Sequence, residues 1–338
     1  MTATRDDVAR LAKVSSATVS YVINDGPRPV SDETKTKVLE AIHQLGYQPN
    51  AVARNLRMQR TFTIGLVIPD THNPYFAEVV SGIEETAFNN GYKVILLHSS
   101  YNTEKEFQFV ELLRTERVDG VIWIPASSNV EPLKELALSE LPTVVFDRVG
   151  AQADLQALVT DNYHGGYLAT RHLIELGHKR IGYISRPVEL SHSQGRLRGY
   201  MDALAEAQIP FDPELIIKGG FLLDDGRRAL FSLLDLPCAP TGVFTYNDMM
   251  AIGVLRGAFE RGLNVPKDLS VVGFDDISQA AFTCPALTTI HLDKFEMGRR
   301  SAILLMALIN KEIPDPKLTQ PAEVRLITRE TTGVAPPM

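Results

Sequence analysis

The chain has 338 residues, of which 44% are hydrophobic and 22% charged, and its formal net charge is -7. This length allows two or three folded units with cores of their own, and no apolar run reaches the roughly 18 residues that a membrane helix needs. The N-terminus has neither the basic flank nor the apolar stretch of a signal peptide. We therefore expect a multidomain cytoplasmic protein that has no contact with a membrane.

Charge is distributed unevenly along the chain. Residues 1–60 contain nine lysines and arginines against six acidic residues, a net charge of +3, so residues 61–338 carry -10. A small basic segment attached to a large acidic one suits contact with a polyanion through one end of the molecule.

Three short helices are expected within the first 45 residues, because apolar residues recur there three and four positions apart. The three sets are Val8, Leu11 and Ala12, then Val19, Val22 and Ile23, then Val38, Ala41, Ile42 and Leu45. Only Lys13 and Val14 separate the first two helices, and Ser15 is suited to cap the second. This spacing is typical of a helix-turn-helix.

The second of these helices has an outer face of small and polar side chains, namely Ser16, Ala17, Ser20, Tyr21 and Asn24. Short side chains allow a helix to lie deep in the major groove of DNA. There, hydroxyl groups bond base edges or phosphates, and an alanine packs on a thymine methyl group. The face therefore favours DNA binding over the alternative, a three-helix bundle with an ordinary surface.

The next stretch, YQPNAVARNLRMQRT, predicts a fourth short helix that starts at Pro49 and Asn50. A lone helix of this length is marginal in water, so it needs a support. A DNA minor groove provides one, with Arg54 and Arg57 on phosphates and Leu56 as a wedge between base pairs. An ordinary flexible linker is the alternative.

The segments DVARLAKVSSATVSYVIN, VSDETKTKVLEAIHQLGYQPNAVARNL and PALTTI resemble the lactose and galactose repressor (LacI/GalR) family of transcription regulators. The resemblance implies that the second helix reads the major groove, with Ser16, Ala17 and Tyr21 at base-reading positions. It also implies a hinge helix over residues 49–58, in which Leu56 intercalates and Arg54 lies near the minor groove. A symmetric homodimer would then bind near-palindromic double-stranded operator DNA.

From residue 63 onward, short Val/Ile-rich runs alternate with helical stretches. The runs are TIGLVIP, KVILLHS, GVIWIP, TVVFD, RIGYIS, GVFTY and SVVGFDD. This alternation predicts an α/β body with parallel sheets covered by helices. The family implies a two-lobed body of the periplasmic-binding-protein type, with crossing segments near residues 161, 290 and 321.

These features together suggest three domains. We expect a helix-turn-helix domain over 1–48, a hinge over 49–61 and an effector-binding and dimerisation domain over 62–338. The subdomains of the last are expected at about 62–160 with 291–320 and about 161–290 with 321–333.

Ligands of open parallel sheets lie beyond the carboxyl ends of the strands. Polar and aromatic residues follow several of the predicted strands, and one arginine lies at the start of a predicted helix; these residues are Asn73, Tyr75, Phe76, Asp147, Arg148, Arg196, Asn247 and Asp275. Such side chains suit a sugar, because carboxylates, amides and arginine bind hydroxyl groups and aromatic rings stack on the apolar face of the sugar ring. Singly, each is more often a solvated loop residue or a helix cap; the family implies that the set touches an effector.

Three further positions bear on the effector. Phe221 falls where the family often places an aromatic wall, although plain packing is the alternative. His291 lies on a crossing segment and is either a cleft residue or a core histidine. Family members that recognise a purine have arginine and threonine in the loop before Arg196, whereas this chain has Leu190 and His192, which argues against a purine effector.

Enzymatic chemistry has little support in the sequence. The motifs GxSxG, HExxH, GxxxxGK[ST] and GxGxxG are missing from any suitable context. Cys238 and Cys284 lack a metal-binding spacing, so we expect no metal and no cofactor. The predicted function is a DNA-binding repressor controlled by a small sugar-like effector. The alternatives are a catabolite-control-type regulator with a phosphorylated carrier protein as coeffector and, more remotely, an exported sugar-binding transport receptor.

Overall fold

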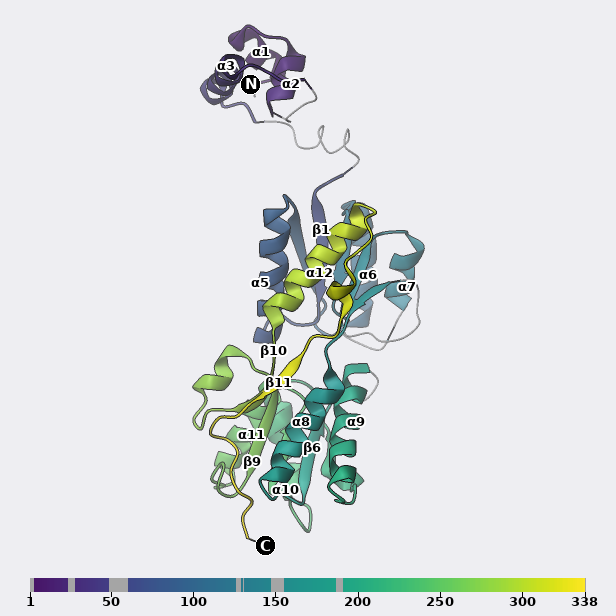
Figure 1. The fold of residues 1–338 in the computed structure, drawn as a ribbon, viewed down its shortest axis with the longest axis vertical. Helices are drawn as coiled ribbons and strands as arrows, with labels where there is room; N and C mark the ends of the chain where they lie inside the picture. The colour runs from purple at the N-terminus through teal and green to yellow at the C-terminus, as the bar shows by residue number, and fades with distance from the viewer. Residues whose placement is uncertain are drawn as a thin grey trace. The chain divides into compact units, whose positions relative to one another are not determined.

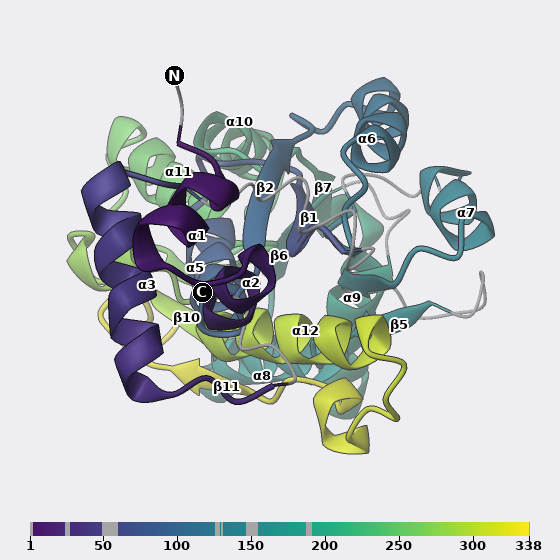
Figure 2. The ribbon, with the colours of Figure 1, turned by 90° about the horizontal axis from the view of Figure 1, so that it is seen from above.

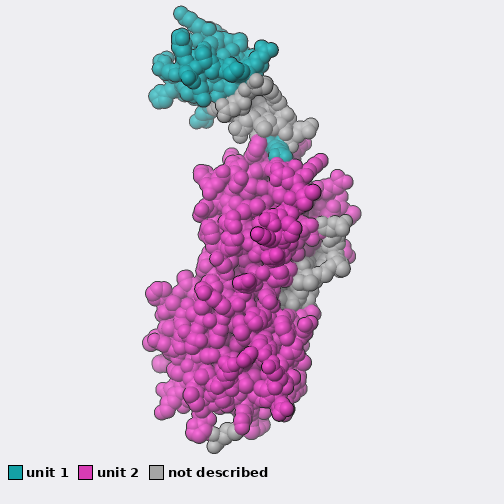
Figure 3. All heavy atoms as spheres, viewed as in Figure 1, with its two compact units in different colours: residues 1–61 teal, residues 62–338 magenta. Residues whose placement is uncertain are grey.

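The computed structural model describes residues 3–23, 28–48, 60–125, 129, 131–146, 155–186 and 191–337. The chain divides into two compact units, residues 1–61 and residues 62–338, which we call the head and the body (Figure 3). Within the described parts of the chain, no helix combines the length and the apolar character required to cross a membrane.

The head contains the three predicted helices, α1 (Arg5–Ala12), α2 (Ser16–Ile23) and α3 (Asp32–Leu45). Thr4 and Asp7 form a reciprocal capping box at the start of α1. Lys13 ends α1 in the left-handed conformation, with φ of 53°, and this allows the tight turn into α2. The hydroxyl of Ser15 accepts a hydrogen bond from the N–H of Thr18 at 3.1 Å, which confirms the predicted cap of α2.

The head core is built from residues on one side of each helix, namely Val8, Ala9, Ala12, Val19, Val22, Val38 and Ala41. Two of the expected inward positions are wrong. Leu11 is 46% exposed and Leu45 is 36% exposed. Three short helices cover only the centre of their common core, so residues at its rim stay in contact with water.

The body contains two sheets with strand orders β2-β1-β3-β4-β5 and β11-β10-β9-β8-β6-β7. The strands are β1 (Thr63–Ile68), β2 (Lys93–His98), β3 (Gly120–Trp123), β4 (Thr143–Phe146), β5 (Gln156–Leu158), β6 (Ile181–Ser185), β7 (Ile216–Lys218), β8 (Gly242–Thr245), β9 (Ser270–Asp275), β10 (Thr288–Leu292) and β11 (Val324–Ile327). The predicted parallel α/β architecture is confirmed, with one departure: β11 runs antiparallel to β10.

Helices cover both sheets of the body (Figure 1). They are α5 (Pro74–Asn89), α6 (Thr103–Thr115), α7 (Glu131–Leu138), α8 (Asn162–Glu175), α9 (Ser191–Glu206), α10 (Leu223–Leu234), α11 (Asp248–Glu260) and α12 (Lys294–Ile309), with short 3-10 helices η1 (Pro213–Leu215), η2 (Ser278–Phe282) and η3 (Pro316–Thr319). We call the first sheet with α5, α6, α7 and α12 the N-lobe, and the second sheet with α8 to α11 the C-lobe.

Three segments of chain connect the lobes: between β5 and α8, between β10 and α12, and between α12 and β11. The first and third run together, because Thr160 forms a parallel bridge with Ala322 and the N–H of Asp161 donates to the carbonyl of Ala322 at 3.1 Å. The two sheets of the body are therefore joined by three connecting segments, two of which are bonded to each other.

Helices α5 and α12 lie side by side in the N-lobe, as Figures 1 and 2 show from two directions. Their backbones approach closely at Gly82 and Gly298. A Cβ atom on Gly82 would clash with the carbonyl oxygen of Phe295, and one on Gly298 would clash with that of Val79. Glycine is thus required at both positions by the distance between the two helices.

Candidate functional site

The exposed face of α2 carries four of the residues predicted to touch DNA. Ala17 is exposed, whereas Ser16, Ser20 and Tyr21 are partly exposed. The hydroxyl of Ser16 donates a hydrogen bond to the carboxylate of Asp6 on α1. Because Val19 and Val22 are buried in the head core, this face of α2 points to solvent.

The other predicted DNA contacts lie outside the described residues. These are Asn24, Arg54, Leu56 and Arg57.

In the body, one small cavity lies where strands of both sheets end. It is lined from the N-lobe by Pro69, Asn73, Tyr75, Phe76, Tyr101, Ile124, Pro125 and Phe146, and from the C-lobe by Arg186, Arg196, Phe221, Tyr246, Asn247 and Asp275. Aromatic rings dominate this lining, and its charged groups are two arginines and one aspartate. Such a combination suits a ligand with an apolar face and several hydroxyl groups.

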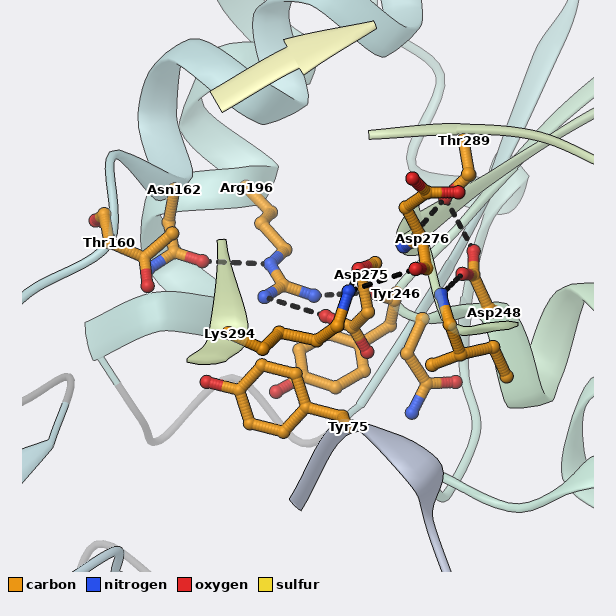
Figure 4. Close-up of polar contacts among 12 residues, drawn as sticks. Tyr75, Thr160, Asn162, Arg196, Tyr246, Asp248, Asp275, Asp276, Thr289 and Lys294 are labelled. Carbon is orange, nitrogen blue, oxygen red and sulfur yellow. Dashed lines mark hydrogen bonds and ion pairs between the residues drawn. The ribbon is translucent and has the colours of Figure 1, made fainter. Parts of the chain in front are cut away.

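Arg196 is buried at the back of this cavity, with 5% of its surface exposed. Its Nε donates to the side-chain oxygen of Asn162 at 2.9 Å, and its Nη1 donates to the backbone carbonyl of Tyr246 (Figure 4). Its Nη2 lies 3.9 Å from a carboxylate oxygen of Asp275. Since Asn162 begins α8, directly after a connecting segment, Arg196 links the cavity to the chain that joins the lobes.

Asp275 is the last residue of β9 and Asp276 follows it, and their side chains face different groups. Asp275 lines the cavity, whereas Asp276 accepts a hydrogen bond from Nη2 of Arg329 at 2.6 Å and lies 2.8 Å from Nδ1 of His291. Burial raises the pKa of Asp276, but the bonds from Arg329 and His291 outweigh burial and hold it below the usual value. His291 is therefore a partner of Asp276 and is not among the residues that line the cavity.

Lys294, the first residue of α12, holds the end of β9 from the N-lobe side. Its ammonium group donates to the carbonyls of Asp275 and Asp276, both at 2.8 Å, and lies 3.4 Å from a carboxylate oxygen of Glu78 on α5 (Figure 4). Only 3% of Lys294 is exposed. One buried cation thus ties the C-lobe strand that carries Asp275 to two N-lobe helices.

Asp248 contacts the loop that follows β9. It is fully buried, and its two carboxylate oxygens accept hydrogen bonds from the hydroxyl of Thr289 at 2.5 Å and from the N–H of Ile277 at 2.8 Å. Burial, and then the charge of Asp275, raise the pKa of Asp248 well above its usual value. Asp248 is therefore a structural group that fixes the loop after β9.

Seven of the nine predicted effector residues meet in this cavity: Asn73, Tyr75, Phe76, Arg196, Phe221, Asn247 and Asp275. The other two, Asp147 and Arg148, lie outside the described residues, as does Leu190. Asn73 and Asn247 also cap helices, because their side-chain oxygens accept from Tyr75 and Met250. Each of these two asparagines therefore caps a helix and also lines the cavity.

Sequence reasoning missed Tyr101, Arg186 and Tyr246, which line the same cavity. Arg186 directly follows β6, Tyr246 directly follows β8, and Tyr101 lies three residues after β2. The rule that searches the carboxyl ends of strands identifies Tyr101 when it includes the strand KVILLH, and it identifies Arg186 and Tyr246 when it includes the residue that directly follows β6 and β8. Among the described residues, no group of three or more His, Cys, Asp or Glu side chains is arranged to hold a metal ion.

Comparison with known proteins agrees with this architecture. Residues 4–50 match the bacterial regulatory proteins of the lacI family, and residues 61–330 match the periplasmic binding proteins and sugar binding domain of the LacI family. The HTH-type transcriptional repressor PurR of Escherichia coli O139:H28 is 40% identical over 339 residues, which cover 99% of this chain and 98% of that protein.

Two solved structures are similar over nearly the whole chain. The lac repressor dimer bound to operator and the anti-inducer ONPF has a TM-score of 0.86 and 29% identity, covering 98% of this chain and 100% of that one. The complex of the transcriptional regulator CelR with cellobiose has a TM-score of 0.75 and 32% identity, covering 97% and 99%. The head with its helix-turn-helix, the two-lobed body and these similarities show that the chain belongs to the LacI family of bacterial regulatory proteins and is a DNA-binding transcriptional repressor, not an enzyme.

Proposed function

We propose that this repressor binds a near-palindromic operator as a homodimer and that a small sugar, bound between the lobes, changes its affinity for that operator. The observation that carries the proposal is the cavity at the strand ends, which combines aromatic rings with Arg196, Asn247 and Asp275. The cellobiose in the complex of the related CelR supports a carbohydrate as the effector class. We place this activity in the cytoplasm, where bacterial DNA lies.

The proposed DNA contacts are the exposed face of α2 together with the hinge residues Arg54, Leu56 and Arg57. The net charge of +3 on residues 1–60 supports them. We keep the domain boundaries expected from the sequence, with DNA binding in 1–48, the hinge in 49–61 and effector binding and dimerisation in 62–338.

In this proposal, the sugar controls DNA binding because the two binding equilibria are linked. A sugar that contacts both lobes binds the closed body more tightly than the open one, so it shifts the population toward closure. If closure alters how the hinge segments meet the DNA, sugar and operator must change each other's affinity by the same factor. Arg196 and Lys294 suit this role, because each connects cavity residues to chain that joins or spans the lobes.

The test is operator binding by the full-length protein. DNA selected from a random pool supplies the operator, and fluorescence anisotropy then gives its Kd with and without D-ribose, D-glucose, cellobiose, glucose 6-phosphate and hypoxanthine. We expect one sugar to change the operator Kd by at least about fivefold. Hypoxanthine is included because Leu190 and His192 argue against a purine effector.

Asp275→Asn should abolish the response, whereas Asp235→Asn, which removes the same charge at an exposed position of the C-lobe, should retain it. An operator Kd that no compound alters would contradict the sugar proposal. That outcome would favour the phosphorylated carrier protein as coeffector and would leave DNA binding untouched.

A further inference from the structure

Tyr101 and Phe221 stack on each other across the cavity. Tyr101 belongs to the N-lobe segment between β2 and α6, and Phe221 to the C-lobe segment between β7 and α10. Their ring centroids are 3.6 Å apart and their planes are inclined by 26°. The two lobes therefore meet here through an aromatic contact inside the proposed effector site.

Phe221 is held firmly from its own lobe. Its N–H donates to the carboxylate of Asp225 at 3.0 Å, and its carbonyl accepts from the amide of Asn247 at 3.2 Å. The guanidinium carbon of Arg186 lies 5.4 Å from the centroid of its ring. Phe221 is thus a fixed platform on which a second ring can stack.

Tyr101 reaches that platform from a strained segment. Ser100 and Tyr101 have φ values of 54° and 57°, the left-handed region that residues other than glycine rarely occupy. Backbone strain of this kind persists only where surrounding contacts enforce it, and it is concentrated at ligand sites. The stack on Phe221 is such a contact, so its loss allows the segment to relax.

The Tyr101 ring also fills the cavity. With the ring in place the cavity has a volume of about 60 Å³, whereas ligand sites in proteins commonly enclose roughly 300–1,000 Å³. In this arrangement of the lobes, a sugar ring therefore does not fit while Tyr101 occupies its place.

We propose that Tyr101 is an internal stand-in for the effector: the effector ring stacks on Phe221 in the position that the Tyr101 side chain occupies, and Tyr101 is displaced when it binds. This inference rests on the proposed function. It narrows the effector to a carbohydrate ring with one face of C–H groups, because that face must replace the aromatic contact on Phe221.

The first experiment needs neither operator nor effector. Tyr101→Ala removes the ring and should leave a vacant place on Phe221 that accepts 4-methylphenol, the analogue of the missing side chain, much as an engineered apolar cavity accepts benzene. We expect saturation-transfer NMR to detect 4-methylphenol on Tyr101→Ala but not on the wild type, on Tyr101→Phe, or on Leu138→Ala. The last is a matched truncation at an N-lobe position that is 84% exposed. No gain of 4-methylphenol binding by Tyr101→Ala would overturn the proposal.

The second experiment measures sugar affinity by calorimetry, with D-ribose, D-glucose and cellobiose as the probes. Removing a competing ring should strengthen the binding of a sugar that the wild type binds, so we expect its Kd to fall roughly three- to tenfold in Tyr101→Ala and to stay within about twofold in Tyr101→Phe. Weaker binding by Tyr101→Ala would assign Tyr101 to the wall of the site and contradict the proposal.

If the wild type binds none of the three sugars, the result with 4-methylphenol alone decides the role of Tyr101. The proposed function is tested by a different measurement, and it is contradicted if no compound alters the operator Kd.

Discussion

His178 is an example of a polar residue that the fold buries for structural reasons. Its side chain is 1% exposed, with Nδ1 2.8 Å from the hydroxyl of Thr241 and Nε2 2.9 Å from that of Ser270. Nε2 also lies 3.2 Å from the carbonyl of Gly333. The ring therefore fixes the C-terminal segment to the base of the C-lobe.

The burial of His178 should affect how the free energy of unfolding depends on pH. Burial lowers the pKa of His178, and burial likewise lowers the pKa of His172. Both are neutral in the folded protein at pH values where the unfolded chain, with a pKa of about 6.5, already takes up protons. The contribution of these two histidines to the free energy of unfolding should thus be constant above about pH 7 and fall below pH 6.5 by up to about 1.4 kcal/mol per pH unit for each group.

Urea denaturation between pH 5.0 and 7.5 measures this slope. His178→Gln should reduce the slope, and His164→Gln, at an exposed position on α8, should leave it unchanged. A slope that is identical in the wild type and His178→Gln would show that His178 does not contribute to it.

At the residue level, the sequence predicted which residues meet in the cavity better than it predicted their individual contacts. The strand-end rule found Asn73, Asn247 and Asp275 because the carboxyl ends of parallel strands meet by geometry. It was applied to only some of the strands, so Tyr101 was missed. The roles of Lys294 and Asp248 were not predictable, because their partners lie 18 to 216 residues away in the sequence. Lys294 contacts Asp275, Asp276 and Glu78. Asp248 contacts Ile277 and Thr289.

At the level of elements, the crossing of α5 and α12 explains two glycines. Gly298→Ala places a Cβ against the carbonyl oxygen of Val79, and that oxygen belongs to a helix backbone that cannot yield alone. We expect a loss of about 1–3 kcal/mol in the free energy of unfolding, measured by urea denaturation.

Gly257→Ala is the matched control on α11. Its Cβ would lie 3.2 Å from side-chain carbons of Arg227 and Leu230, which can adjust, and alanine is favoured over glycine in a helix interior by roughly 0.5–1 kcal/mol. Gly257→Ala should therefore be neutral or slightly stabilising. Equal losses in the two variants would argue against a special role for the α5–α12 crossing.

Helices and strands with a clear apolar periodicity were predicted from the sequence, whereas short strands without such a periodicity were missed. The three head helices, six buried strands and the more exposed strand β2 follow directly from apolar spacing. Strands β5 and β7 have only three residues each, and β11 (VRLI) contains a charged residue, so none forms a conspicuous apolar run. Short strands at or near sheet edges are defined by pairing with a neighbour and not by their own composition.

At the scale of the whole molecule, the lobes must move relative to each other if a sugar is to control DNA binding. Lys294 spans them, since it holds the backbone of Asp275 and Asp276 in the C-lobe and pairs with Glu78 in the N-lobe. Asp275 and Asp276 both have positive φ, at 113° and 49°. The ammonium group of Lys294 therefore stabilises a strained turn whose first side chain lines the cavity.

Lys294→Met should uncouple the sugar from the operator. Methionine keeps an unbranched apolar side chain but removes the donor, so the turn that carries Asp275 loses its connection to α5 and α12. We expect the factor by which the sugar changes the operator Kd to fall by about fivefold or more, while the Kd for the sugar itself changes by less than about threefold. Fluorescence anisotropy with the selected operator and calorimetry with the sugar give the two numbers, and Lys311→Met, at an exposed position after α12, is the control. Full coupling in a folded Lys294→Met protein would mean that closure reaches the head through the connecting segments at Thr160 and Ala322, with Arg196 and Asn162 as the link to the cavity.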